Sequence, residues 1–268
     1  MLVNKLFVFQ LITSFIIGGG FIALLSLLAE RVNSRLSGLI IMFPSTIALG
    51  FFFLGWATSP ATVSTVAPAI LIPLGLTTLF PIVYIRIARY CELVLPSKIW
   101  QIILSFVGSA AIWLALSLPI AVLQVRSLVL GMAGYVLLVS ISHFFTHRQY
   151  ASMPSPLTYT LGQKIGRAIF VGFIVTLILY LSKTINPFWG SIFAVFPAAL
   201  SSMLILFHWY YGAKSLLPTV QKVAVGSISI AVYALTVIVV FPKFGFVLGT
   251  LFAYIASLFV SLYLSKQR

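Results

Sequence analysis

Acidic residues are nearly absent from this 268-residue chain, which contains Glu30, Glu92 and no aspartate. Two-metal hydrolysis, a pair of catalytic carboxylates and a Ser-His-Asp triad are therefore each short of components. The single cysteine, Cys91, excludes a disulfide within the chain and a Cys-based metal cluster. His143 and His147 lie one helical turn apart, but no third ligand for a metal is visible. We expect a protein that is not an enzyme and has no cofactor or metal.

Charged residues of either sign are also scarce, at 7% of the chain, whereas 62% of the residues are hydrophobic. Soluble domains carry roughly 25% charged residues. Apolar runs of about 20 residues, enough to cross a bilayer as a helix, recur from end to end. The sequence therefore predicts an all-α polytopic membrane protein whose main partner is the lipid bilayer. The basic residues stand singly or in pairs between these runs, which does not favour nucleic acid as a partner.

Hydropathy and its polar interruptions predict about nine transmembrane helices. The first run, 7–28, is too long for the apolar core of a signal peptide, so we expect a retained span. The short segment "PIAVLQVRS" is expected to form a tight turn between two helices. The nine predicted ranges are 7–28, 37–56, 67–88, 99–123, 127–146, 166–184, 188–211, 219–241 and 244–264.

The 16 basic residues divide 12 to 4 between the two sides of this arrangement. Because lysine and arginine collect on the cytoplasmic side, the split predicts an external N-terminus and a cytoplasmic C-terminus. The expected location is the cytoplasmic (inner) membrane of a bacterium or archaeon. The larger set comprises Arg31, Arg35, Arg86, Arg89, Lys98, Arg148, Lys164, Arg167, Lys214, Lys222, Lys266 and Arg268.

A shift of 153 residues aligns two similar segments, "IIMFPSTIALGFFFLGW" and "IFAVFPAALSSMLILFHW". Five predicted spans separate the copies, and this odd number inverts the second copy in the membrane. We therefore predict two inverted-topology repeats, residues 1–123 and 166–268, joined by a linker helix and a cytoplasmic loop over 124–165. The identities are Asn33 with Asn186, Phe43 with Phe196, Pro44 with Pro197 and Trp56 with Trp209.

The segment "LYLSKTINPFWGSIFAVFPAALSSMLILFHWYYG" resembles the GlpM-like family of small bacterial inner-membrane proteins, and "LFPIVYIRI" is similar to another segment of that family. The resemblance implies two four-helix units fused in opposite orientation. It also implies a connection to exopolysaccharide production. The first half departs from the family pattern, because Glu30 in "LLAERVN" aligns with Lys183 of "LSKT".

The two Phe-Pro pairs are the candidate site. A proline inside a helix frees the carbonyl four residues earlier, Ile40 for Pro44 and Phe193 for Pro197. One interpretation is a pair of packed kinks; the other is that both kinks line a central solute site, where freed carbonyls and hydroxyls contact the solute. The substrate-lining candidates are Phe43, Pro44, Ser45, Thr46, Phe196, Pro197, Ser201 and Ser202.

Three further polar residues have alternative interpretations. Glu30 and Lys183, at predicted helix ends, are either interfacial anchors or groups that carry a proton and attract an anion. His208, next to Trp209, belongs either to an interfacial aromatic belt or to a proton relay. The belt is the prediction for His208.

These features predict a transporter-like or permeation protein for a small neutral or anionic solute. A high-affinity cation site would require carboxylates within the spans. The alternative is a membrane scaffold or regulatory subunit of an envelope or exopolysaccharide system. A homo-oligomer is possible, although nothing in the sequence supports one.

Overall fold

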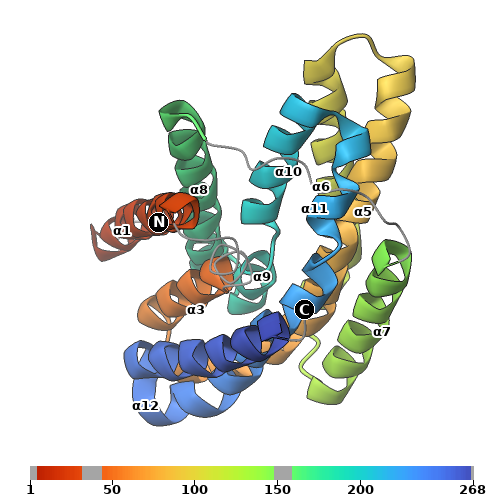
Figure 1. Cartoon of the computed structure of the whole chain (residues 1–268). Helices are drawn as coiled ribbons and strands as arrows, with labels where there is room; N and C mark the ends of the chain where they lie inside the picture. The colour runs from red at the N-terminus through yellow and green to blue at the C-terminus, as the bar shows by residue number, and fades with distance from the viewer. Residues whose placement is uncertain (1–4, 32–43, 148–158, 267–268) are drawn as a thin grey trace.

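The computed structural model describes residues 5–31, 44–147 and 159–266, and all regular structure in these ranges is helical (Figure 1). Short 3-10 helices are labelled η. In chain order the elements are α1 (Lys5–Arg31), α3 (Ser45–Ala57), α4 (Pro60–Val66), η1 (Ala67–Ile70), α5 (Leu71–Val94), α6 (Lys98–Val122), α7 (Leu128–His147), α8 (Leu161–Thr184), α9 (Pro187–Phe193), α10 (Ala198–Tyr211), η2 (Ala213–Ser215), α11 (Leu217–Val220) and α12 (Val223–Lys266).

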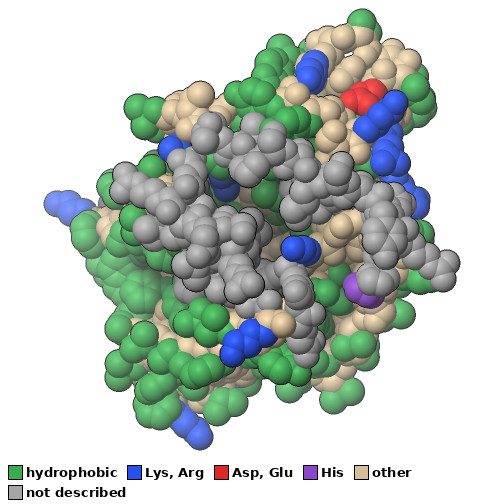
Figure 2. Space-filling model, viewed as in Figure 1, with side chains coloured by type: hydrophobic (Ala, Val, Ile, Leu, Met, Phe, Trp, Pro, Cys, Tyr) green, Lys and Arg blue, Asp and Glu red, His purple; other side chains and the backbone are tan. Residues whose placement is uncertain are grey.

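Seven helical segments in these ranges are long and apolar enough to cross a membrane. The surface agrees with this assignment, because hydrophobic side chains cover much of the face in Figure 2 and large apolar groups point outward on α6 and α7. Val107 of α6 and Val129 of α7 are examples, with exposed fractions of 53% and 81%. The chain is therefore a multi-pass membrane protein.

Several predicted helix limits agree with the structure. The predicted spans 7–28, 99–123 and 127–146 correspond to α1, α6 and α7. The predicted tight turn between the last two is confirmed, since α6 ends at Val122, α7 begins at Leu128 and Gln124 has a positive φ of 49°.

Helix α8 begins at Leu161, five residues before the predicted start at 166. Thr160 and Gln163 explain the earlier start: the Thr160 side chain accepts the Gln163 N–H, and the Gln163 side chain accepts the Thr160 N–H. This capping box satisfies two amide donors that a helix start would leave open. The helix therefore includes three polar or small residues, Gly162, Gln163 and Lys164, that lie outside the apolar run.

Helix α12 is a hairpin of two apolar arms, 223–244 and 246–266, joined at Gly245 with φ of 74°. The arms run antiparallel, because the Ser257 hydroxyl donates to the Ser229 carbonyl at 2.9 Å and the rings of Tyr233 and Tyr254 lie 5.4 Å apart. The separate predicted helices 219–241 and 244–264 correspond to these arms. A left-handed backbone conformation of this kind favours glycine.

Helices α1 and α8 cross closely at two glycines (Figure 1). A Cβ atom at Gly19 would lie 2.7 Å from the Ala168 carbonyl oxygen, and one at Gly172 would lie 2.8 Å from the Phe15 carbonyl oxygen. The helices are antiparallel, since Leu27 near the end of α1 shares a groove with the first residue of α8. These glycines allow the two backbones to approach each other without side chains between them.

Helix α5 packs against α6, α7 and α12. Its side chains Phe80 and Tyr84 are almost fully buried, as are Phe51 and Phe53 of α3 and Tyr233 of α12. In Figure 1 the α5–α6 turn, the end of α10 and the start of α8 lie at the upper end of the molecule, and α9 lies nearer the lower end. Of the helices that carry candidate site residues, α10 packs against α5, whereas α3 packs against α8, α9 and α12.

Candidate functional site

Pro197 interrupts a helix, whereas the sequence predicted a kink within a continuous helix over 188–211. Helix α9 ends at Phe193 and α10 begins at Ala198, so the prediction of continuity is wrong. Proline lacks an N–H and disfavours helical backbone at the preceding residue, so the helix stops and restarts. Pro197 then acts as the cap residue of α10, and its carbonyl accepts the Ser201 N–H at 2.7 Å.

Pro44 has the same role at the start of α3. Its φ and ψ are −75° and 55°, against −76° and 52° for Pro197. Its carbonyl accepts the Ala48 N–H at 3.0 Å. Pro44 therefore precedes a helix rather than lying inside one. The predicted helix 37–56 is wrong at this residue, because α3 begins only at Ser45. Phe43 and Ile40 lie outside the described residues.

The carbonyl predicted to be free, that of Phe193, is not free. It accepts the Phe196 N–H at 3.0 Å in a tight turn. The carbonyl that needs a partner from another helix is that of Val195, which accepts the Thr77 hydroxyl of α5 at 2.7 Å. The indole N–H of Trp113 on α6 in turn donates to the Thr77 hydroxyl at 3.0 Å. The break between α9 and α10 is thus held by α5 and α6.

Aromatic packing surrounds the same break. Phe196 is 7% exposed, and its ring centre lies 5.2 Å from that of Trp113 and 6.3 Å from that of Phe80. Edge-to-face arrangements such as these are favourable between aromatic rings. Phe196 is therefore buried among aromatic side chains of neighbouring helices.

The Thr77→Val variant tests whether the hydroxyl holds the α9–α10 break. We expect unfolding in detergent to become easier by about 2 kcal/mol, because the buried Val195 carbonyl loses its donor. Thr65→Val is the matched control: the Thr65 hydroxyl bonds within its own helix at 2.8 Å and is exposed, so its stability should change by less than about 0.5 kcal/mol. Equal stability of the two variants would contradict the assignment.

The predicted small polar residues differ in their environments. Ser45 is buried and Thr46 is half-buried on α3. The Ser202 hydroxyl donates to the Ala199 carbonyl at 2.8 Å. Ser201 is fully buried, and its hydroxyl has no hydrogen-bond partner among the described residues. Ser201 therefore has the one hydroxyl of this group that is buried without a partner.

The two Phe-Pro segments are linked through α9. Helix α3 packs against α8, α9 and α12, whereas α10 packs against α8, α6 and α5. A Cβ atom at Gly50 of α3 would lie 3.0 Å from the Cβ atom of Ala194, at the end of α9. One cavity lies between α1 and α8 and another, of about 590 Å³, between α7 and α12, and neither is lined by the predicted site residues.

Glu30 and Lys183 are not brought together. Lys183 is exposed in the last turn of α8, and residue 30 lies in the last turn of α1, whose side chains there are outside the described residues. Because α1 and α8 are antiparallel, these two turns lie at opposite ends of the pair. This placement agrees with positions on opposite sides of a membrane.

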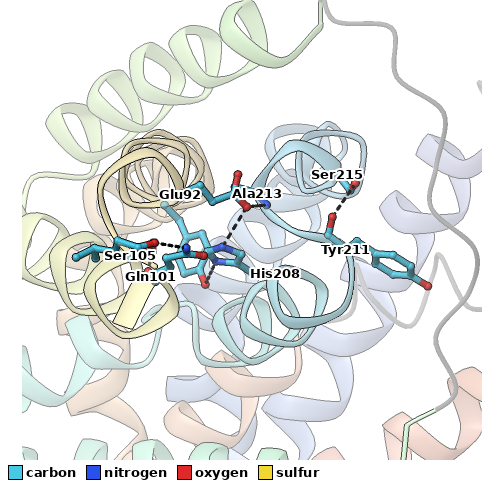
Figure 3. Close-up of polar contacts among 9 residues, drawn as sticks. Glu92, Gln101, Ser105, His208, Tyr211, Ala213 and Ser215 are labelled. Atoms are coloured by element: carbon cyan, nitrogen blue, oxygen red, sulfur yellow. Dashed lines mark hydrogen bonds and ion pairs between the residues drawn. The ribbon is translucent and has the colours of Figure 1, made fainter. Parts of the chain in front are cut away.

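A polar cluster that sequence reasoning missed joins α5 to α10 (Figure 3). The Nε2 atom of His208 lies 3.7 Å from Oε1 of Glu92, and its Nδ1 atom lies 3.2 Å from the Tyr84 hydroxyl. The same Glu92 oxygen accepts the Ala213 N–H at 2.6 Å. His208 is fully buried, so the prediction that it belongs to an interfacial belt is wrong, although its neighbour Trp209 is 45% exposed.

The cluster brings together rare residue types, since the chain has 2 acidic residues and 3 histidines. That rarity was the one signal in the sequence that pointed to Glu92. Ionisable side chains within membrane helices are costly, and those that persist commonly serve a function. No group of three or more potential metal-ligating side chains occurs in the described ranges. The cluster therefore brings a carboxylate, an imidazole and a phenol hydroxyl close together.

No protein-family model matches the chain, and no curated protein or solved structure shows significant similarity to it.

Proposed function

We propose that the protein is a transporter or permeation protein for a small neutral or anionic solute, built from two inverted repeats. The repeats are residues 1–123 and 166–268, and the linker 124–165 contains α7. The proposed site lies near the helix starts that follow Pro44 and Pro197.

The spacing of elements supports the repeat. Helix α3 begins at Ser45 and α10 at Ala198, 153 residues apart, and the preceding prolines have the same backbone conformation. The same shift carries α1 onto α8 and α5 onto the first arm of α12. Sequence offset and element order therefore agree along most of both halves.

The α1–α8 crossing supports an inverted relation between the halves. Gly19 contacts Ala168 while Gly172 contacts Phe15, and residues 19 and 172 differ by 153, as do residues 15 and 168. Shifting one residue of a contact forward by 153 positions and the other back by 153 therefore gives the other contact. Exchanged contacts between antiparallel helices are expected where a twofold axis in the membrane plane passes between them. This reciprocity is the single observation that carries the proposal.

The distribution of charge supports the orientation, with the N-terminus outside and the C-terminus in the cytoplasm. The α5–α6 turn, the start of α8 and the end of α10 lie at one end of the molecule in Figure 1. These segments carry residues of the basic set predicted to be cytoplasmic, including Lys98, Lys164 and Lys214. Because positive charges tend to remain inside, this clustering supports a cytoplasmic position for this end of the molecule.

Uptake into proteoliposomes tests transport against a panel of small neutral and anionic solutes. We expect Pro44→Ala and Pro197→Ala to lower the uptake rate at least tenfold, because alanine does not fix the backbone conformation that proline holds before α3 and α10. Pro96→Ala is the control, since Pro96 is exposed in the α5–α6 turn, and it should transport like the wild type. Unchanged uptake in both proline variants would contradict a role for Pro44 and Pro197 in transport.

Cysteine labelling in whole cells tests the inverted topology. In a Cys91→Ser background, a cysteine at Ala61 should react with an impermeant reagent from outside, and one at Lys214 should react after the membrane is opened. Both positions are exposed, so accessibility to water rather than burial decides the result. Reaction of both from the same side would exclude two inverted repeats.

A second candidate function is a non-transporting scaffold or regulatory subunit of an envelope or exopolysaccharide system. The aromatic packing of Phe196 against Trp113 favours it, because a solute would have to separate these rings. The resemblance of residues 179–212 to the GlpM-like family favours the same candidate. The scaffold would be favoured over the transporter if no solute is taken up and one specific envelope protein co-purifies with the chain.

A further inference from the structure

We propose that Glu92, His208 and Tyr84 form a proton-binding site that links the end of α5 to the end of α10. The inference adds a coupling ion, the proton, to the proposed transport function. Only the coupling of the proton to solute movement rests on that function. Proton binding itself can be tested without any solute.

Both ring nitrogens of His208 face oxygen atoms that can accept a hydrogen bond. The Tyr84 hydroxyl lies 3.2 Å from Nδ1 of His208, within hydrogen-bond distance, whereas Nε2 is buried and has no hydrogen-bond partner among the described residues. The nearest carboxylate oxygen, Oε1 of Glu92, is 3.7 Å away, slightly beyond a hydrogen bond. A neutral imidazole carries a proton on one ring nitrogen, whereas the imidazolium carries one on each. In the charged form Nε2–H is directed at the Glu92 carboxylate and Nδ1–H at the Tyr84 oxygen, which can accept it.

The site also has a route to water. The His208 side chain is fully buried, whereas that of Glu92 is 27% exposed. Glu92 can therefore exchange a proton with the aqueous phase and pass it to the imidazole that it faces.

Charged groups on the neighbouring elements define the electrostatic setting. Helix α5 contributes Tyr84 and Glu92, α6 contributes Lys98, and η2 contributes the exposed Lys214. The Lys98 ammonium lies 6.0 Å from the Trp209 ring, next to His208, and opposes a second positive charge there. Helix α8 contacts α10 through Gln163, whose side-chain amide donates to the Tyr210 hydroxyl at 2.7 Å. Burial disfavours a charged imidazole most strongly, so an imidazolium at His208 depends on the nearby carboxylate of Glu92.

Protonation changes how firmly two helix ends are attached. Glu92 belongs to α5, but it holds the last turn of α10 through His208 and the following turn through the Ala213 N–H. The chain reverses between these points at Gly212, where φ is 76°. A charged His208 attracts Glu92 more strongly than a neutral one, so proton release loosens the end of α10. Because α10 begins at Pro197, this motion reaches the proposed solute site.

Histidine-labelled protein in lipid nanodiscs allows His208 to be titrated by NMR, with its signals assigned from a His208→Asn spectrum. We expect the His208 signals to report one protonation step as the pH is lowered. In Glu92→Gln, which keeps the acceptor for the Ala213 N–H but loses the charge, the proton affinity of His208 should fall about tenfold or more. His143→Asn is the control and should leave the His208 titration unchanged.

Two results would overturn the proposal: a wild-type His208 that stays neutral down to pH 5, or a titration midpoint that is the same in Glu92→Gln. The first needs no variant, so a folding defect cannot obscure it. If a transported solute is found, uptake by Glu92→Gln should no longer respond to a pH gradient. If His208 titrates as expected but no solute is taken up, the proton-binding site would be supported and the transport function would be contradicted.

Discussion

The Gly190→Ala variant is expected to lose about 3 kcal/mol of unfolding free energy or to fail to fold, because a methyl group there has no space. Gly190 lies in α9 against α8, and its Cβ atom would collide with the Ile178 carbonyl oxygen and the Ser182 hydroxyl. A hydroxyl can rotate away, but a carbonyl within a helix cannot. Denaturant unfolding in detergent and gel filtration measure the loss.

A matched glycine separates this collision from the general effect of adding a methyl group. Gly166 lies in α8, and a Cβ atom there would have no other heavy atom within 4 Å. Gly166→Ala should therefore be as stable as the wild type within about 1 kcal/mol. Adding Ser182→Gly to Gly190→Ala should recover part of the loss and leave the carbonyl collision. A Gly190→Ala protein with wild-type stability would contradict the close α8–α9 packing.

Gly19→Ala and Gly172→Ala are each expected to lower the unfolding free energy by about 2 kcal/mol, because each methyl group would push α1 away from α8. Their Cβ atoms would lie 2.7 Å and 2.8 Å from a backbone oxygen of the other helix. The reciprocal contacts predict nearly equal losses for the two variants. Denaturant unfolding in one detergent compares them directly.

The neighbouring Gly20 provides the control for this pair. It is exposed, and no other heavy atom would lie within 4 Å of its Cβ atom. Gly20→Ala should therefore keep wild-type stability within about 1 kcal/mol. Strongly unequal losses in Gly19→Ala and Gly172→Ala would argue against the twofold relation between the halves.

Local features of the sequence allowed several helix limits to be predicted. The apolar run 127–146 matches α7 within one residue at each end, because its limits coincide with a tight turn and with polar residues. The two arms of α12 were also separable, since Pro242 and Lys243 interrupt the apolar pattern just before Gly245. These limits depend on residues near them in the chain.

The structure around Pro197 could not be predicted in the same way. A proline indicates that one helical hydrogen bond is lost, but not whether the helix bends or stops. Here the outcome depends on the Thr77 hydroxyl, which bonds to a carbonyl 118 residues later. The cluster around His208 also depends on residues that are distant in the chain. Tyr84 is 124 residues from His208, and the Glu92–Ala213 hydrogen bond joins residues 121 positions apart. Nothing near either residue in the chain indicates such partners.

The α1–α8 crossing sets the order in which the protein can assemble. Helix α1 ends at residue 31, and its main packing partner begins at residue 161. At about 5–20 residues per second of synthesis, α1 waits roughly ten seconds in the lipid before α8 emerges. During that time its Gly18–Gly19 surface faces lipid, open to the same surface of another nascent chain. Slower translation between residues 31 and 161 lengthens this interval and should increase pairing between wrong copies.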